Sequence, residues 1–491
     1  MSRILIASAS FSLILLAGCG SAPKRATPET NLTVPPVWTA GVPAEEEAVD
    51  AWWSGFGSPV LDSLVPAALA RNYDLAAALA RLDAAAAEAR VAGAGLWPSL
   101  DLSYAASRSR RNFIGFPSFG GDGGVARTTS NSHGVSLNSG WEIDLWGRVR
   151  AGKSAAAAEA EATLADLGGT RLSIAAQTAK AYFAAVEAQQ QLRLARVTSK
   201  NYRLSADRIR SRFERGIRSS LDLRLALASL AASEALVELR RGQYDRAVRQ
   251  LEILLGRYPR GDEALPEELP AAGAPVPAGL PDELLGRRPD LVAAERRVAA
   301  SDARVRGAKR ALLPGIRLTA SGGRSSEEIK DLLDGDYTVW SIAGNLLQPL
   351  FQGGKLRANV DLAEARSRQA LAAYASAVLR AFAEVESALA SEEFLAAREE
   401  ALRRATEQAV AARDLADERY RSGLADIVTV LESQRQALAA ESEFLNVRRL
   451  RLDARVDLHL ALGGGFDFDR ALADRFAGER APTTETEVQA R

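Results

Sequence analysis

The sequence contains two copies of one unit, and this duplication limits what the chain can fold into more than any other feature does. The stretch GLWPSLDLSYAASRS at Gly95 returns 216 positions later as ALLPGIRLTASGGRS at Ala311. Aligning residues 71–109 with residues 287–325 without a gap gives 15 identical pairs in 39 positions. Because a repeat of this kind makes each copy one structural unit, function has to be sought in the repeated unit.

The positions of proline divide the chain in the same way. Residues 120–257 and 351–480 contain no proline, whereas residues 259–281 contain six. The proline-free blocks consist mainly of strong helix formers, and residues 154–211 would form a helix of roughly 87 Å at about 1.5 Å per residue. Leucine recurs every seven residues from Leu424 to Leu452, which favours helices packed as in a coiled coil. A plain coiled-coil rod would show the same pattern.

Short segments of alternating apolar and polar residues argue for more than a rod. They lie at residues 100–104, 135–145, 316–321 and 340–346, so each copy holds one pair. We expect strands of about ten residues, joined within each pair by a loop rich in Gly, Ser, Asn and Asp. Such strands suit a transmembrane β-barrel, although soluble sheets alternate too. Since the smallest membrane barrels have about eight strands, several chains would have to share one barrel.

The N-terminus has the features of a secretory signal. Arg3 supplies a positive charge, and the apolar run at residues 4–16 is shorter than the roughly 20 residues that a membrane-spanning helix needs. Its ending, LAGC, resembles the bacterial lipoprotein signal, in which the cysteine becomes the lipid-bearing first residue. Cys19 is also the only cysteine, which excludes disulfides and thiolate metal sites. We predict a mature chain that begins at lipid-modified Cys19; an ordinary signal cleaved nearby is the alternative.

Enzymatic activity has no support in the sequence. The 62 basic and 62 acidic residues balance, so no overall charge favours nucleic acid. His133 and His459 are the only histidines and lie in opposite copies, and neither HExxH nor GxSxG occurs. Gly353, Gly354 and Lys355 lack the upstream glycine of a phosphate-binding loop. We therefore expect no catalytic site, no metal and no cofactor apart from the covalent lipid on Cys19.

Four stretches together resemble the TolC-like outer-membrane efflux proteins, and most closely the lipid-anchored NodT-type branch that serves resistance-nodulation-division pumps. They are WWSGFGSPVLDSLVPAALARNYDLAAALARLDAA at Trp52, WEIDLWGRVRAG at Trp141, LLGRRPDLVAAERRVAASDARV at Leu284 and LLQPLFQGGKLRA at Leu346. The resemblance covers Trp52 to about Gly463. It implies a mixed, mainly α fold: a homotrimer in which each chain gives four strands to one outer-membrane β-barrel, which continues into a long α-helical periplasmic tunnel.

The resemblance also implies a function. The chain would be the outer-membrane channel of a tripartite efflux pump, a passive exit duct for drugs or other small molecules that works with a periplasmic adaptor and an inner-membrane pump. The alternative is a periplasmic coiled-coil adaptor or structural lipoprotein, which would also have a signal, long hairpins and no catalytic residues. Two matched strand pairs favour the duct. Within the channel class, a type I secretion duct is the other candidate, although the lipoprotein signal favours drug efflux.

The repeats, the prolines and the resemblance divide the chain into six segments. Each repeat is expected to contain a helix, a strand pair and a helical hairpin. The segments are a signal peptide at 1–18, a lipid-anchored tether at 19–51, the first repeat at 52–256, a proline-rich connector at 257–281, the second repeat at 282–463 and a polar C-terminal tail at 464–491.

The turns of the two helical hairpins are the candidate partner-contact sites. Gly216 suits the residue just past a helix, and Ser219 with Asp222 resembles a capping arrangement for the next helix. Gly423 and Asp426 hold the corresponding positions in the second copy. A plain helical hairpin would have the same turns; the resemblance implies that they form the adaptor-docking, periplasmic end of the tunnel.

A candidate gate follows the second turn. Val428, Glu432 and Arg435 lie close to one face of the expected helix. In the resembling family the equivalent helix narrows to a constriction, with an apolar ring and a carboxylate ring from three subunits, and the carboxylate is often aspartate where this chain has Glu432. Three converging carboxylates repel unless each is paired, and Arg435 or a neighbouring chain could supply the partner. An ordinary solvated Glu and Arg pair is the alternative.

Overall fold

The computed structural model describes residues 22–30, 32, 34–40, 51–113, 126–274 and 276–476. It divides into two compact units. The first unit consists of the residues up to 28 with residues 83–161 and 295–372, and the second consists of residues 29–82, 162–294 and 373–491. Each unit therefore takes equivalent segments from both copies of the repeat.

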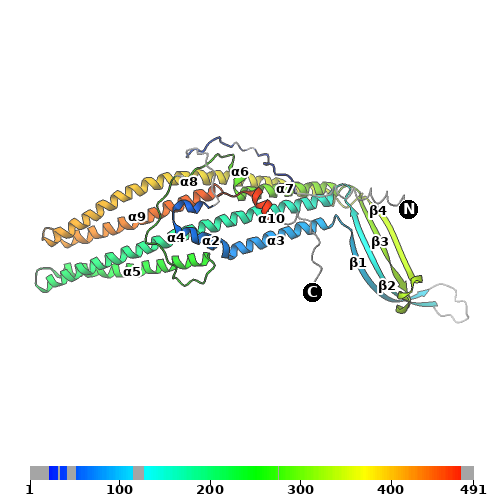
Figure 1. Ribbon diagram of the computed structural model, residues 1–491, viewed down its shortest axis with the longest axis horizontal. Coiled ribbons are helices and arrows are strands. Elements are labelled where there is room, and N and C mark those ends of the chain that lie inside the picture. Colours follow the sequence, from blue (N-terminus) through cyan, green and yellow to red (C-terminus); the bar gives the residue numbers. More distant parts are fainter. Residues whose placement is uncertain are drawn as a thin grey trace, which may run out of the picture. The chain divides into compact units, whose positions relative to one another are not determined.

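A single antiparallel sheet forms the distinctive part of the first unit (Figure 1). Its strands pair in the order β1-β2-β3-β4. They are β1 (Ser99–Phe113), β2 (Ala126–Ile143), β3 (Gly315–Ser326) and β4 (Thr338–Leu347). Two short 3-10 helices, η3 (Ile329–Leu333) and η4 (Gly335–Tyr337), lie in the β3–β4 connection. The expected strand pairs are present, but β1 has 15 and β2 has 18 residues, so this pair is longer than the expected ten.

The helices of the two copies have equal lengths. α3 (Tyr73–Ala94) and α7 (Pro289–Arg310) have 22 residues each and lie 216 positions apart. The hairpins are α4 (Arg148–Glu214) with α5 (Ser220–Leu254), and α8 (Lys355–Arg421) with α9 (Ile427–Ala461). α4 and α8 have 67 residues each, α5 and α9 have 35 each, and these pairs lie 207 positions apart. The difference of nine residues, 216 minus 207, therefore lies between α3 and α4, where the strands are.

Shorter elements complete the second unit: η2 (Trp52–Phe56), α2 (Pro59–Arg71), α6 (Leu284–Arg287) and α10 (Phe468–Phe476). Helix α10 falls within the segment expected as a polar tail, and Phe468 is buried against Leu82 and Val292. This segment therefore begins as part of the core, because the apolar side chains of Phe466 and Phe468 pack there. Among the described residues, no helix is both long and apolar enough to cross a membrane.

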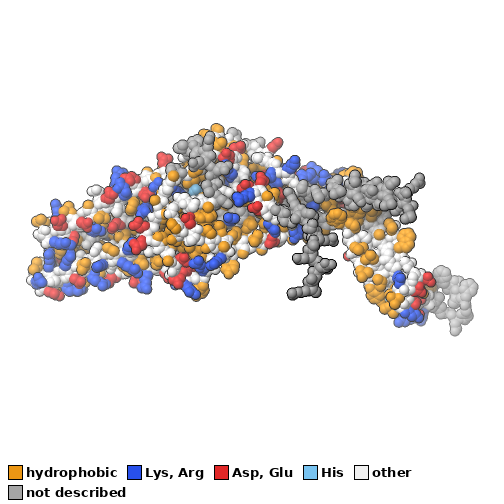
Figure 2. Space-filling view, in the orientation of Figure 1, with side chains coloured by type: hydrophobic (Ala, Val, Ile, Leu, Met, Phe, Trp, Pro, Cys, Tyr) orange, Lys and Arg blue, Asp and Glu red, His pale blue; other side chains and the backbone are white. Residues whose placement is uncertain are grey.

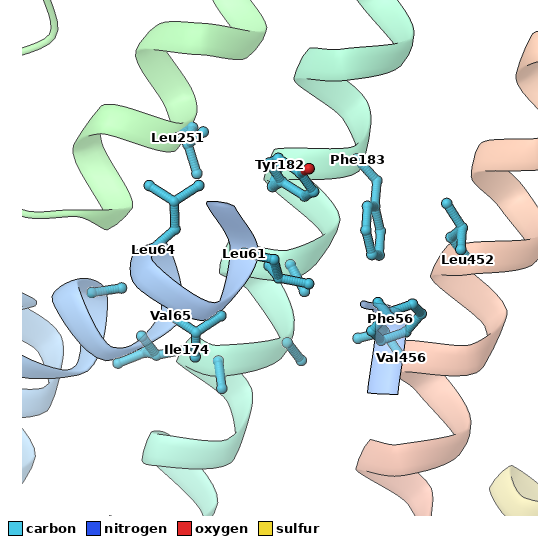
Figure 3. Packing of buried hydrophobic residues seen from close by; sticks show 14 of the residues in the cluster. Phe56, Leu61, Leu64, Val65, Ile174, Tyr182, Phe183, Leu251, Leu452 and Val456 are labelled. Carbon is cyan, nitrogen blue, oxygen red and sulfur yellow. The ribbon is translucent and has the colours of Figure 1, made fainter. Parts of the chain in front are cut away.

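The core of the second unit forms where α2 meets both helical hairpins (Figure 3). Ser58 starts α2 by accepting a hydrogen bond from the backbone of Leu61, and its hydroxyl lies 2.9 Å from the hydroxyl of Tyr182 on α4. Figure 3 shows how side chains from η2, α2, α4, α5 and α9 converge on this point: Phe56, Leu61, Leu64, Val65, Ile174, Tyr182, Phe183, Leu251, Leu452 and Val456. The tryptophan-rich opening of the repeat is thus the centre of a buried core.

In each copy, a side chain at the start of the first long helix binds the end of the helical hairpin. At the start of α3, Asn72 Nδ2 donates a hydrogen bond of 3.1 Å to the carbonyl of Leu254, the last residue of α5. At the start of α7, Arg288 Nη1 donates one of 3.2 Å to the carbonyl of Ala461, the last residue of α9. These contacts satisfy carbonyl groups that a helix end leaves without a partner.

Two glycines make this closure sterically possible. Gly256 and Gly463 lie just past α5 and α9 with φ of 67° and 88°. A Cβ at Gly256 would come within 2.5 Å of the carbonyl oxygen of Arg71, and a Cβ at Gly463 within 2.5 Å of that of Arg287. Because these neighbours are backbone atoms, no rotamer change relieves the clash.

The segment expected as an extended tether makes specific contacts. In the first unit, the carbonyl of Pro23 accepts a hydrogen bond of 2.7 Å from Arg296, and Arg25 pairs with Glu295. In the second unit, Trp38 is buried and its indole N–H donates to the carbonyl of Gly279 at 3.1 Å. Cys19, the predicted lipid site, lies outside the described residues.

Candidate functional site

The strand register places apolar and polar side chains on opposite faces of the whole sheet. Leu102 lies opposite Leu137, Leu137 opposite Gly322, and Gly322 opposite Trp340. Because side chains alternate along a strand and paired residues share a face, these pairs define one face across all four strands. We call it the apolar face; it carries Leu100, Leu102, Tyr104, Val135, Leu137, Trp141, Ile143, Ile316, Leu318, Trp340, Ile342 and Leu346.

The opposite, polar face is tied together by hydrogen bonds between strands. The hydroxyls of Ser103 and Ser136 lie 2.9 Å apart, and Asn138 Nδ2 donates to Ser103 at 3.0 Å. Ser321 and Ser341 make the equivalent contact of 2.8 Å between β3 and β4. Small hydroxyl side chains of this kind line a surface that water can wet.

In the single chain the apolar face is open. Leu102 is 75% exposed, Trp340 76% and Ile342 75%. Figure 2 shows hydrophobic side chains along the strand region, with charged ones gathered at its far end. A continuous apolar surface over four strands marks a membrane or protein contact, since monomeric soluble proteins rarely expose one of this extent.

The edges of the sheet are also open. Among the strands that the structure describes, β1 pairs only with β2 and β4 only with β3. An edge strand carries a row of backbone N–H and C=O groups without partners, which attracts another strand. In lipid each such group would cost several kcal/mol, so an open edge requires closure with a further strand.

The two hairpin turns have the same geometry. Gly216 and Gly423 adopt φ of 73° and 79°, the left-handed conformation that favours glycine. Ser219 caps α5 by accepting a hydrogen bond of 3.2 Å from the backbone N–H of Asp222. Asp426 caps α9 by accepting one of 2.8 Å from Thr429, whose N–H and hydroxyl hold the pKa of the Asp426 carboxyl below its ordinary value. Both turns therefore have well-defined helix starts.

The candidate gate residues occupy the first turns of α9. Glu432 is held in a two-pronged pair by Arg435, with Nε to Oε2 at 3.0 Å and Nη2 to Oε1 at 2.7 Å. These hydrogen bonds lower the pKa of the Glu432 carboxyl. Val428 is 57% exposed. The structure thus brings Glu432 and Arg435 together within one chain and leaves Val428 open to whatever faces the helix.

The two hairpins also touch near their turns, in a contact that the sequence did not lead us to expect. Tyr420 on α8 is buried, with the guanidinium carbons of Arg218 and Arg212 at 4.9 and 5.4 Å from its ring centre. Such contacts contribute about 0.5–2 kcal/mol each. The only signal in the sequence is an aromatic residue shortly before each turn glycine, Phe213 in RFERG and Tyr420 in RYRSG.

Comparison with known proteins places the whole chain among channels. A family model described as "outer membrane efflux protein" matches residues 64–257 and 280–464. The pyoverdine export outer membrane protein OpmQ of Pseudomonas aeruginosa is 33% identical over 464 residues, 93% of this chain and 96% of OpmQ. The toluene efflux pump outer membrane protein TtgC of Pseudomonas putida is 31% identical over 498 residues, 98% of this chain and 100% of TtgC. The crystal structure of the CmeC outer membrane channel of Campylobacter jejuni matches with a TM-score of 0.85 at 25% identity, covering 94% of this chain and 98% of CmeC.

Proposed function

Because the chain belongs to the outer membrane efflux protein family and is the outer-membrane channel component of an efflux pump, we propose that it works as a homotrimer whose three sheets close into one barrel. The observation that carries the proposal is the strand register, which gives the sheet one apolar face, one polar face and two open edges. Three protomers contribute four strands each. In this arrangement β1 of one protomer pairs with β4 of the next, the apolar face contacts lipid and the polar face lines the lumen.

The helical hairpins continue this barrel as a periplasmic tunnel. Transport through it is passive, and the energy comes from an inner-membrane pump that a periplasmic adaptor links to the channel. The adaptor binds at the hairpin turns, formed by Gly216, Ser219 and Asp222 in the first copy and by Gly423 and Asp426 in the second. Capped helix starts support this role, because they hold the turns in one geometry.

The constriction of the closed tunnel lies at the start of α9. Val428 supplies an apolar ring and Glu432 a carboxylate ring. The pairing of Glu432 with Arg435 of the same chain supports this assignment, since it lets three carboxylates approach without a full repulsion between them.

The exported cargo is small molecules, drugs among them. OpmQ is named for pyoverdine and TtgC for toluene, two chemically different compounds, although the two relatives are 33% and 31% identical to this chain. A duct of this family is therefore compatible with varied solutes. We assign the selection of cargo to the partner pump.

The chain is anchored in the outer membrane by a lipid on Cys19 after residues 1–18 have been removed. The LAGC ending of the signal and the absence of any other cysteine support this anchor. Intact-mass measurement should give a mature chain with an acylated first cysteine, and Cys19→Ser should remove the added mass. An unmodified mature N-terminus in the wild type would contradict the anchor.

The mass of the detergent-solubilised particle tests the barrel. We expect the mass of three protomers, together with ion conductance when the particle is inserted into planar bilayers. A particle with the mass of one protomer and a complete native strand signal in circular dichroism would contradict the shared barrel, since a single open sheet would then be stable by itself.

A further inference from the structure

An open crevice of about 690 Å³ lies on the apolar face of the sheet, between the strands and the β3–β4 connection. This volume is within the range of about 300–1,000 Å³ that ligand pockets occupy. Gly322 lies in its floor, and a Cβ there would meet no atom within 4 Å. Its apolar walls are Leu102 and Tyr104 of β1, Val135 and Leu137 of β2, and Ile329 and Leu333 of η3.

Arginine side chains lie on the apolar face at the edge of the crevice and farther along β1. Arg324 lines it and donates a hydrogen bond of 3.1 Å to the carbonyl of Leu332. Arg108 and Arg110 lie four and six positions beyond Tyr104 on β1, so the alternation of the strand puts them on the apolar face, the nearer one about 14 Å away. Both are exposed, and neither guanidinium is paired with another side chain in the part of the chain that the structure describes. Arg111, next to Arg110, falls on the polar face.

Three acidic residues of the β3–β4 connection, Glu328, Asp331 and Asp334, have hydrogen-bond or ion-pair partners within the connection or at the end of β3. Glu328 forms an ion pair of 2.7 Å with Lys330, and Asp331 accepts a hydrogen bond from Ser326. Within the described residues, no acidic side chain of the connection pairs with Arg108 or Arg110, so both guanidinium groups can bind an external anion.

We propose that the crevice and these arginines form a binding site for a phosphorylated, multi-acyl lipid of the outer leaflet. Acyl chains fill the crevice, and phosphate groups bind Arg108, Arg110 and Arg324, because guanidinium groups match phosphate with two hydrogen bonds at once. The inference rests on the proposed placement of the sheet in the outer membrane. In that placement the arginines lie at the strand ends away from α4 and α7, at the level of the outer headgroups.

The choice of a lipid over a protein partner follows from where the charges lie. The arginines are confined to one end of the face that contacts lipid, directly beside its apolar residues. A headgroup and its chains have this same division of charge along one molecule. Arginines at the boundary of an apolar band also extend naturally toward headgroups, with their aliphatic stems on the apolar surface.

The sheet offers a matched control on its other face. Arg111 and Arg317 both point to the polar face, so Arg111→Gln/Arg317→Gln removes the same charge as Arg108→Gln/Arg110→Gln without touching the site. Gly322→Leu fills the floor of the crevice, where there is room for the new side chain. The two kinds of variant separate phosphate binding from acyl binding.

Native mass spectrometry of the purified full chain, titrated with diphosphoryl lipid A and with its dephosphorylated form, tests the site. We expect Arg108→Gln/Arg110→Gln to weaken binding of diphosphoryl lipid A about tenfold or more, because it removes the charge-assisted hydrogen bonds to phosphate. We expect Gly322→Leu to weaken binding by about as much, because its side chain occupies the space of the acyl chains. The Arg111→Gln/Arg317→Gln variant should bind like the wild type. Dephosphorylated lipid A should bind the wild type as weakly as phosphorylated lipid A binds the Arg108→Gln/Arg110→Gln variant.

Two results would overturn the site while leaving the channel intact: equal weakening by both arginine double variants, or binding that Gly322→Leu leaves unchanged. The same spectra report the number of protomers. A monomer mass in every sample would instead overturn the proposed trimer, so the two failures are distinguishable.

Discussion

The helices of the two copies have equal lengths and matching turns, but the side chains that they carry differ. The turn glycines Gly216 and Gly423 lie 207 positions apart, as do the capping residues Ser219 and Asp426, and both pairs have matching geometry. Where the second copy has Val428, Glu432 and Arg435, the first has Leu221, Leu225 and Ala228. The charged pair of the candidate gate therefore exists in one hairpin only, and the other hairpin is its natural control.

The same pattern is found at the other end of the hairpins, where Gly256 and Gly463 lie against the start of their own copies. Gly256 and Gly463 hold equivalent positions, and at each one a neighbouring backbone oxygen leaves no room for a Cβ. One turn earlier the copies diverge. Glu252 in the first copy accepts hydrogen bonds from the backbone of Gly261 and Asp262 in the connector, whereas His459 in the second stacks on Trp52 with ring centres 5.1 Å apart. Positions that the backbone constrains are the same in both copies, and positions that meet different neighbours are not.

The largest effect should come from adding a methyl group at the closing glycines. Gly256→Ala and Gly463→Ala each place a Cβ 2.5 Å from a backbone oxygen in a left-handed conformation, so we expect each to lower the free energy of unfolding by about 3 kcal/mol or more. Gly216→Ala and Gly423→Ala have similar φ but open space around the Cβ and should lose only about 1–2 kcal/mol. Thermal unfolding compares the four variants, and equal losses at turns and closures would show that the close approach is unimportant.

His459, which takes the place of Glu252 in the second copy, predicts that the stability of the fold depends on pH. Burial lowers the pKa of His459 from 6.5 to about 4. The folded state then binds no proton where the unfolded state does, so its stability is fully present above about pH 6.5 and is lost as the pH falls toward 4, by up to about 3 kcal/mol. His459→Phe keeps the ring stacked on Trp52 and should remove this part of the acid sensitivity. Denaturation at pH 7 and pH 4.5 checks it; an identical pH dependence in variant and wild type would contradict the account.

Replacing Val428 and Glu432 together with alanine should loosen the closed constriction. We expect a several-fold higher conductance in planar bilayers without adaptor, because both rings are removed. Leu221→Ala/Leu225→Ala changes the equivalent positions of the first copy and should leave conductance near the wild-type value. If conductance, its salt dependence and antibiotic permeability all stay unchanged in the α9 variant, these residues are surface and the gate lies elsewhere.

The smallest effects should come from the helix caps. Ser219→Ala and Asp426→Ala each remove one hydrogen bond from the first turn of a helix, so amide hydrogen exchange there should become several-fold faster while the rest of each hairpin stays protected. Asp426→Ser keeps a capping oxygen and should restore slow exchange. Uniformly faster exchange along α9 would mean that the cap affects more than the turn.

Much of the fold could be predicted because it depends on local signals. The duplication, the long helices and the turn at each hairpin follow from composition, periodicity and glycines such as Gly216 and Gly423. The existence of two strand pairs follows from alternation in the same way. The comparisons confirm the family, the fold class and the channel function that the four quoted stretches imply.

The features that could not be predicted depend on contacts between residues far apart in the chain. The last residues of β1 and the first residues of β2 are rich in Ser, Arg, Thr and Asn and show no apolar alternation. They nevertheless pair, and the hydroxyls of Ser109 and Ser130 lie 3.0 Å apart across the two strands. The stacking of Arg218 on Tyr420 joins residues 202 positions apart, 420 minus 218. The contacts of Pro23 with Arg296 and of Trp38 with Gly279 are of the same kind, since the sequence around Pro23 and Trp38 does not indicate which distant residues they bind.

The central claim is that the strand register divides the sheet into a lipid face and a lumen face, and thiol accessibility in proteoliposomes tests it most directly. The chain has one native cysteine, Cys19, so single cysteines can be placed at each position from Leu100 to Ala105 in a Cys19→Ser background. A water-soluble maleimide should label the variants at Asp101, Ser103 and Ala105 and spare those at Leu100, Leu102 and Tyr104. Equal labelling at neighbouring positions, or the opposite alternation, would contradict the assignment of the two faces.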